Sequence, residues 1–419
     1  MRRNKAKKLA KVNGNALIAE IDIGKKVNYG YFRAPDGQDI KPFAFHNLRD
    51  GFEMFWTKLV EFQRGHNLEG IVVGFESTGP YAEPMLHFLK EKKATLVQTN
   101  PMHTKRLKEL TGNSPNKTDA KDPKVIADVI TLGHALTLVI PEGPAAELRR
   151  LSQARERAIK SRTAMSNQLQ HLLFVLFPEF LWTMKHMKSK SVLHLVENCP
   201  TPESIIRMGI EALSAILRKI SRGRPGQERA KEIFEAAQKS VGISEGRESI
   251  LREIQHLVSN IGNEGCFIAS LEKEMEHYLE KIPYSRSILS IKGIGKVTAA
   301  GLIGEVGDFR KFSTISQITK LAGLDLYEIS SGRKKGQRHI SKRGRSYLRK
   351  ILFFASLSMV RNKGILHAQY QQAVDRGMAK IKALIAMSRK LLRIIFAIVR
   401  DNTVYASNHE HMCHSKLAA

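Results

Sequence analysis

The stretch GIVVGFE at residues 70–76 decides the fold of the N-terminal part of the chain. It is an almost continuous apolar run that ends in an acid, which is typical of a strand buried on both faces of a sheet. Two further β-rich runs, ALIAEIDI at 16–23 and ATLVQT at 94–99, lie on either side of it. Apolar residues recur at helical spacing over 48–62. This alternation predicts an α/β layer over 16–130 with a central mixed sheet.

The middle of the chain has a different pattern. Residues 147–177 and 229–282 are long, charged and free of proline, which indicates long antiparallel helices. The intermittent spacing of three and four is compatible both with a coiled coil and with an ordinary helical bundle. The Gly/Pro/Arg-rich segment 221–227 is expected to separate the two arms.

A third part follows, with short helices, a basic loop at 330–345 and apolar helices at 347–361 and 379–401. The chain is therefore expected to combine an α/β domain with all-α domains. The expected domains are 1–144, 145–282, 283–405 and a disordered tail at 406–419. The tail contains HEHMCH, which could bind a metal, although a disordered end is the simpler interpretation.

Composition restricts the function. The chain has 419 residues, with 68 Lys and Arg against 40 Asp and Glu, which gives a net charge of +28. Such an excess indicates a polyanionic partner, above all nucleic acid. The three cysteines are far apart, so a disulfide framework and a paired-cysteine zinc site are excluded. No secretory signal or membrane-spanning run is present, and we expect a cytoplasmic protein without membrane association.

Four acids stand out by position. Asp22 and Glu76 end two of the apolar strands, and Asp119 and Asp122 lie three apart where a helix begins. Acids at strand ends and at this spacing can converge on one crevice at the edge of an α/β sheet. Carboxylates suit Mg²⁺, and one or two ions could support phosphoryl transfer. Alternatively, Asp119 or Asp122 caps the helix and Asp22 belongs to a turn, while Asp128 is expected to be a solvated helix position.

Two segments near the C-terminus are candidates for nucleic-acid contact. In SIKGIGKVTAAGLIGEVGDF, residues Gly293 and Gly295 allow a tight hairpin before a helix that is expected to start near Thr298. This helix-hairpin-helix pattern would direct backbone N–H groups and Lys296 at a phosphate. A plain glycine-bearing helix connection is the alternative.

The second segment, residues 331–350, has nine Lys and Arg and no acid. A solvated face normally mixes charges of both signs, so this segment indicates nucleic-acid contact. The candidate contacts are Arg333, Lys334, Lys335, Arg338, Lys342, Arg343 and Arg345. Ser331 begins the segment, but a serine needs a base or a metal beside it to act as a nucleophile. Most serines in such loops are only loop residues, and His339 is either a helper or another backbone contact.

At this point the chain resembles a known family, the DEDD transposases of insertion-sequence family one-hundred-ten, which includes the Piv-type pilin-gene invertases. The resemblance rests on KTDAKD at 117–122, on the glycine-rich segment after 292, and on the SSG, HISKRG and YLRK motifs between 330 and 350. It covers roughly 16–140 and 283–402. Leu326 and Tyr327 depart from the pattern, since prolines and small residues are frequent there in relatives.

The resemblance implies a RuvC-like domain with the RNase-H fold, a coiled-coil domain and a C-terminal transposase domain. It assigns Mg²⁺ binding and catalysis to Asp22, Glu76, Asp119 and Asp122, and the nucleophile to Ser331. The neighbouring Ser330 leaves an ambiguity of one residue. Because some members are guided by a bridge RNA, a guide RNA is an implied partner beside donor and target DNA.

We therefore expect a DNA transposase or recombinase that cuts and rejoins strands through a serine, and that forms a homodimer assembling into a tetramer. One alternative is a metal-dependent junction nuclease that uses water. Another is a nucleic-acid-binding scaffold without catalysis.

Overall fold

The computed structural model describes residues 15–76, 79–112, 122–184, 187–221, 226–328, 336 and 338–406. The chain forms two compact units, residues 1–139 and 140–419. Among the described residues, no helix has the length and apolar character needed to cross a bilayer.

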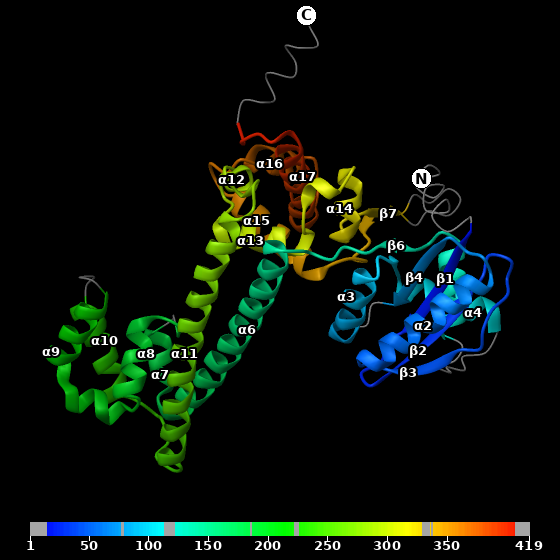
Figure 1. The fold of residues 1–419 in the computed structure, drawn as a ribbon. Helices are drawn as coiled ribbons and strands as arrows, with labels where there is room; N and C mark the ends of the chain where they lie inside the picture. Colours follow the sequence, from blue (N-terminus) through cyan, green and yellow to red (C-terminus); the bar gives the residue numbers. More distant parts are fainter. Residues whose placement is uncertain are drawn as a thin grey trace, which may run out of the picture. The chain divides into compact units, whose positions relative to one another are not determined.

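The N-terminal unit is built on a mixed sheet with the strand order β3-β2-β1-β4-β5-β6 (Figure 1). The strands are β1 (Ala16–Asp22), β2 (Val27–Arg33), β3 (Phe43–His46), β4 (Gly70–Glu76), β5 (Thr95–Thr99) and β6 (Leu136–Thr137). Strands β1, β4 and β5 are parallel, and the remaining pairs are antiparallel. The predicted mixed α/β layer is confirmed.

Helices cover both faces of this sheet. The helices are α2 (Arg49–Gly65), α3 (Glu83–Glu91), α4 (Pro101–Gly112) and α5 (Asp122–Thr131), with a short 3-10 turn η1 (Gly79–Ala82). On one face, Phe55 of α2 packs its ring 5.3 Å from Phe32 of β2 and 5.1 Å from Phe45 of β3. On the other face, Ile126 and Ile130 of α5 are buried against the sheet. The sheet is thus the middle of three layers.

The C-terminal unit is mostly helical. Its long helices are α6 (Pro144–Leu176) and α11 (Arg247–Glu280). Arg155 of α6 pairs with Glu272 of α11 at 2.6 Å, and Gln168 donates to Glu253 at 2.7 Å. Residues later in α6 therefore meet residues earlier in α11, so the two helices are antiparallel, as predicted and as Figure 1 shows.

Four shorter helices pack at one end of the pair: α7 (Pro178–Thr183), α8 (Lys190–Asn198), α9 (Pro202–Ser221) and α10 (Gly226–Gln238). The segment 221–227 runs from the last residue of α9 to the start of α10, so the two long helices are separated by four shorter helices and not by this segment alone. The arm predicted over 229–282 is also interrupted, at 239–246. There Gly242 lies against the end of α6, where an added Cβ would come within 1.8 Å of the Leu176 carbonyl oxygen.

The other end of the long helices joins the C-terminal elements in one hydrophobic core. These elements are α12 (Ser285–Leu289), α13 (Lys296–Val306), the 3-10 turn η2 (Phe309–Lys311), α14 (Ile315–Leu321), β7 (Leu326–Glu328), β8 (Arg338–Ile340), α15 (Ser346–Met359), α16 (His367–Asp375) and α17 (Lys380–Asp401). Leu148 of α6 and Met275 of α11 are buried in this core together with Leu391 of α17. The predicted helices at 347–361 and 379–401 correspond to α15 and α17.

Candidate functional site

Asp22 and Glu76 lie at the carboxyl ends of two neighbouring parallel strands. The β1–β4 pairing continues to Ile21 and Phe75, so Asp22 and Glu76 are the next residues along the two strands. Side chains alternate between faces along a strand, so Asp22 shares the face of Glu20. Glu76 shares the face of Gly74 for the same reason. Because Glu20 lies directly over Gly74, all four positions are on one face.

Helix α5 covers this face of the sheet. The direction in which the helix runs shows at which end of the sheet its first residue lies. Lys124 of α5 lies over the Tyr31 ring at 5.4 Å, and Tyr31 pairs with Glu20 in the β1–β2 register. Asp128, one turn later, contacts Arg33, which pairs with Ile18. The helix therefore runs opposite to β1, and it begins at the end of the sheet where β1 and β4 finish. The backbone of Asp122 starts α5 there, whereas its side chain and the whole of Asp119 lie outside the described residues.

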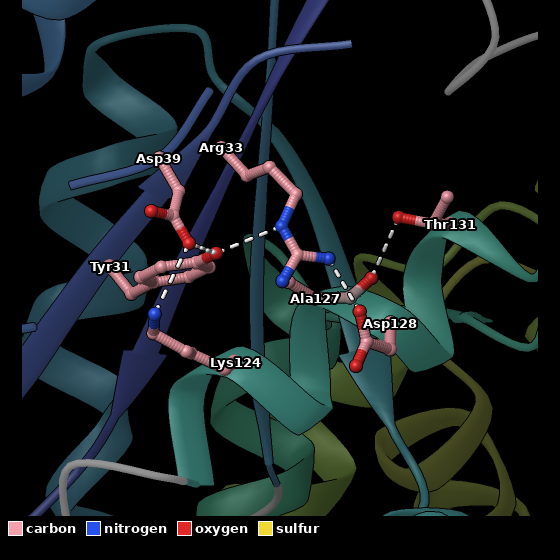
Figure 2. A network of polar contacts seen from close by, with 7 residues as sticks. All are labelled: Tyr31, Arg33, Asp39, Lys124, Ala127, Asp128 and Thr131. Atoms are coloured by element: carbon pink, nitrogen blue, oxygen red, sulfur yellow. Dashed lines mark hydrogen bonds and ion pairs between the residues drawn. The ribbon is translucent and has the colours of Figure 1, made fainter. Parts of the chain in front are cut away.

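A partly buried polar network holds α5 on the sheet (Figure 2). Asp128 accepts a hydrogen bond of 2.5 Å from Arg33, whose Nε donates to the Tyr31 hydroxyl at 2.8 Å. Tyr31 donates to Asp39 at 2.6 Å, and Lys124 donates to the same carboxylate at 3.2 Å. Burial, followed by the bond to Asp39, raises the pKa of Tyr31 to about 12. The prediction that Asp128 is a solvated helix position is wrong, because an arginine from β2 reaches it.

Glu20 is a residue that the sequence reasoning missed. It is fully buried, and neither carboxylate oxygen has a hydrogen-bond partner among the described atoms. Burial holds its pKa well above the usual range, while the Arg33 charge acts in the opposite direction. The signal was present in the sequence, since this acid lies two residues before Asp22 inside an apolar strand.

The donor chemistry at the strand ends fits a hard divalent cation. Asp22 and Glu76 are both half-buried and are neighbours in the register of the sheet, and two like charges at such positions favour a cation between them. A Mg²⁺ site usually takes only one or two protein carboxylates, with water and substrate phosphate completing the shell. Within the described residues no three His, Cys, Asp or Glu side chains are grouped to hold a metal.

Strands β7 and β8 form a small antiparallel hairpin in the C-terminal unit. Tyr327 and His339 face each other across it with ring centroids 6.0 Å apart, and Arg338 pairs with Glu328 at 3.0 Å. Residues 329–337 connect these strands, and Ser331 belongs to this connection. Apart from Gly336, the connection lies outside the described residues, and so do Ser330, Arg333, Lys334 and Lys335.

The glycine hairpin before α13 is present. Gly293 has φ of +103°, a conformation that favours glycine, and Gly295 is the residue before α13. The helix begins at Lys296, two residues earlier than expected, and the ammonium group of Lys296 pairs with Glu276 at 2.8 Å. The backbone of the hairpin remains exposed at both glycines.

The basic residues after β8 differ in their surroundings. Lys342 and Arg343 are exposed. Arg345 is only partly exposed: its side chain is 18% exposed, lies 3.9 Å from Glu305 and donates to the Glu305 backbone. Burial and the nearby Arg149 lower its pKa to about 10. We therefore leave Arg345 out of the nucleic-acid interface and assign it to the packing of α13.

Two family matches cover the two parts of the chain described above. Residues 19–178 match the DEDD family of IS110 elements, described as "Transposase". Residues 285–371 match the "Transposase IS116/IS110/IS902 family". The chain belongs to the IS110 family of DEDD transposases. The predicted family is thereby confirmed.

Relatives of this IS110-family transposase carry names that are consistent with the family assignment. An uncharacterized protein of insertion element IS110 from Streptomyces coelicolor is 24% identical over 92% of this chain and 95% of its own length. The transposase of element IS1111A from Coxiella burnetii is 24% identical over 69% of this chain and 68% of its own length. The pilin gene-inverting protein of Moraxella lacunata is 31% identical over 29% of this chain and 39% of its own length.

Membership establishes that the protein is an enzyme of the DNA transposase and recombinase class, acting on DNA. It also implies that the family uses a divalent metal in general.

Proposed function

We propose that this IS110-family transposase cuts and rejoins DNA through a covalent serine intermediate. In this proposal Asp22, Glu76, Asp119 and Asp122 hold Mg²⁺, and Ser331 attacks the scissile phosphate. The observation that carries it is the register of the sheet, which makes Asp22 and Glu76 neighbours on the face where α5 begins.

We assign the N-terminal unit to the RuvC-like RNase-H fold. The support is its sheet of three antiparallel strands continued by parallel β4 and β5, with acids at the ends of the two central parallel strands. The C-terminal unit carries the connection with Ser331, so acids and serine belong to different units. An assembly of two or four chains, as expected from the long helices, is one way to bring them together.

When bound, Mg²⁺ would withdraw charge from the non-bridging oxygens of the phosphate. The chain's own part begins with Asp22 and Glu76, whose half-buried position fixes their oxygen atoms. The basic residues that follow Ser331 in the sequence would stabilise the charge that builds up on the phosphate during attack.

The serine step is a transesterification. The Ser331 oxygen forms a bond to phosphorus, and the bond between phosphorus and one strand oxygen breaks. The serine proton is lost, and the leaving strand gains one at its freed hydroxyl group, so protons balance. The phosphoserine link retains the energy of the broken bond, and rejoining therefore needs no nucleotide cofactor.

The decisive experiment compares Ser331→Ala with Ser330→Ala as the matched control. Wild-type protein and Ser330→Ala, stopped in denaturant during reaction, should carry covalently attached DNA on a denaturing gel. Ser331→Ala should carry none and should still bind DNA. Loss of a single backbone-contacting hydroxyl costs only about 1 kcal/mol, or less than tenfold. A Ser331→Ala protein that recombines at above a tenth of the normal rate would refute the serine mechanism and favour the junction nuclease.

The acids are tested separately. Asp22→Asn and Glu76→Gln should abolish adduct formation and weaken Mg²⁺ binding measured by calorimetry, with the fold retained. Asp128→Asn is the control, because Asp128 lies on the helix that covers the same face of the sheet but pairs with Arg33. This variant should keep both adduct formation and Mg²⁺ binding. Full activity of folded Asp22→Asn protein would sink the metal assignment.

Nucleic-acid binding is proposed for the hairpin at Gly293 and Gly295 and for the cations between 333 and 343. Neutralising Lys334, Lys335 and Lys342 together should flatten the salt dependence of duplex binding by roughly 0.9 per lost contact. Arg338 and Arg343 belong to the same proposal. An unchanged slope would mean that this segment is only a solvated surface. A guide RNA is supported by the net charge of +28, and sequencing of RNA that copurifies with the protein tests it.

A further inference from the structure

Helix α17 carries a second basic surface outside the site described above. Between Lys380 and Arg400 the helix has six Lys and Arg and no acid. One face is buried in the core, with Leu391, Leu392 and Ile395 fully covered. The other face is a stripe with a spacing of three and four residues, so its side chains lie along one line of the helix. We call this the α17 stripe, and its residues are Lys382, Ala386, Arg389, Lys390, Arg393 and Ala397.

The α17 stripe borders an open surface pocket. The pocket has a volume of about 560 Å³, and the described residues that line it all belong to α17. Along the helix, Arg389, Lys390 and Arg393 lie between the small side chains of Ala386 and Ala397. The charged groups that the described lining presents are all positive.

Arg389 and Arg393 form a pair of like charges one turn apart. Arg389 is partly buried, and its Nε has no hydrogen-bond partner among the described atoms. Burial, followed by repulsion from Arg393, lowers the pKa of Arg389, and Asp325 partly offsets this effect. Arg400, at the end of the helix, is already neutralised by Asp401 at 2.7 Å. The repulsion between like charges is thus concentrated at Arg389 and Arg393, in the middle of the stripe.

We propose that the α17 stripe binds the phosphate backbone of DNA. A guanidinium group presents a planar fork of donors that matches phosphate oxygens in a bidentate manner. A phosphate between Arg389 and Arg393 would remove the repulsion between the two cations. The choice of DNA as ligand rests on the proposed function, whereas the phosphate-binding chemistry rests on the stripe itself.

The location of the stripe suits this role. Asp325 is close enough to Arg389 to act on its charge, and it directly precedes β7. The stripe therefore lies near the base of the β7–β8 hairpin, whose connection includes Ser331. DNA held on α17 would be anchored close to the segment that is proposed to cut it.

The test measures affinity of the full-length protein for a short mixed-sequence DNA duplex by fluorescence anisotropy at several salt concentrations, with EDTA present so that no cleavage occurs. Arg389→Ala combined with Arg393→Ala should lower the salt slope by about 1.8, since each phosphate contact contributes about 0.9. At ~0.15 M salt this corresponds to a loss of affinity of about 30-fold. Lys231→Ala combined with Lys239→Ala removes the same charge from exposed positions around α10 and is the matched control.

Arg393→Ala alone serves if the double variant is unstable, because Arg393 is exposed; it should lose about half of the slope change. A double variant that binds duplex like its control would overturn the proposal. Weakened binding of single-stranded RNA with unchanged duplex binding would overturn it as well. The covalent Ser331 adduct is a separate readout. Its absence from the wild-type protein would refute the proposed serine mechanism and would leave the test of DNA binding by the α17 stripe unaffected.

Discussion

Replacing Gly74 by alanine tests how Glu20 is packed against β4, directly behind the proposed metal-binding acids. In the structure an ideal Cβ at residue 74 would lie 2.2 Å from Oε1 of Glu20 and 2.2 Å from Cδ1 of Ile130. Both distances are far below van der Waals contact, so both side chains must move away from the new methyl group.

Neither side chain can move into solvent, because Glu20 and Ile130 are both 0% exposed. Overpacking of a closed core costs about 1–3 kcal/mol, and we expect Gly74→Ala to destabilise the N-terminal unit by about 2 kcal/mol. In a Glu20→Ala background one of the two overlaps is absent, and the space left by the carboxylate lets the new methyl group and Ile130 move apart. There the same substitution should cost less than about 0.5 kcal/mol, which gives a coupling energy of about 1.5 kcal/mol or more.

The assay must report on the N-terminal unit alone, since a chain with two units need not unfold in one step. The protein has two tryptophans, Trp56 in α2 of this unit and Trp182 in the other unit. In a Trp182→Phe background, urea unfolding followed by the fluorescence of Trp56 isolates the N-terminal transition. All four proteins of the double-mutant cycle are measured in EDTA.

An equal cost of Gly74→Ala in the two backgrounds would show that Glu20 does not lie over Gly74. A cost below about 0.5 kcal/mol in the wild-type background would contradict the closed packing itself. Either result would remove the register argument that places Asp22 beside Glu76.

Three further outcomes are expected. Asp128→Asn should lower the free energy of unfolding of the N-terminal unit by roughly 1 kcal/mol, because it loses the charged bond from Arg33; no change in urea midpoint would contradict this. Desolvation alone would raise the pKa of Glu179, but hydrogen bonds from Ser240 and from backbone N–H groups outweigh that effect and lower it. The ionised carboxylate therefore stabilises the folded state above pH ~4.5, and this contribution is lost as the pH falls through the lowered pKa. Glu179→Gln should therefore be destabilising near neutral pH and silent in acid, and a pH-independent difference in thermal unfolding would argue against the bond. Gly304→Ala should destabilise the C-terminal unit by about 1–3 kcal/mol, since its Cβ would come within 2.6 Å of the α6 backbone; a calorimetric scan without a shift would refute that close approach.

Much of the fold follows from local pattern. The alternation of apolar runs and helical spacing over 16–130 predicted the strands and helices of the N-terminal unit. An acid at the end of an apolar strand is a local signal too, because a charge is tolerated where the strand leaves the core. The sequence alone therefore pointed to Asp22 and Glu76.

The tertiary structure determined which strands are neighbours and which side chains contact one another. Periodicity does not say which strands are neighbours, so only the parallel β1–β4 register makes Asp22 and Glu76 adjacent. The same limit explains Asp128, whose partner Arg33 is 95 residues away. Arg345 looked like one more cation of a basic segment, yet it lies against Glu305 of another helix. Charge, spacing and strand ends are properties of neighbouring residues and can be predicted from the sequence; burial and partnership depend on contacts between distant segments, and only the folded chain determines them.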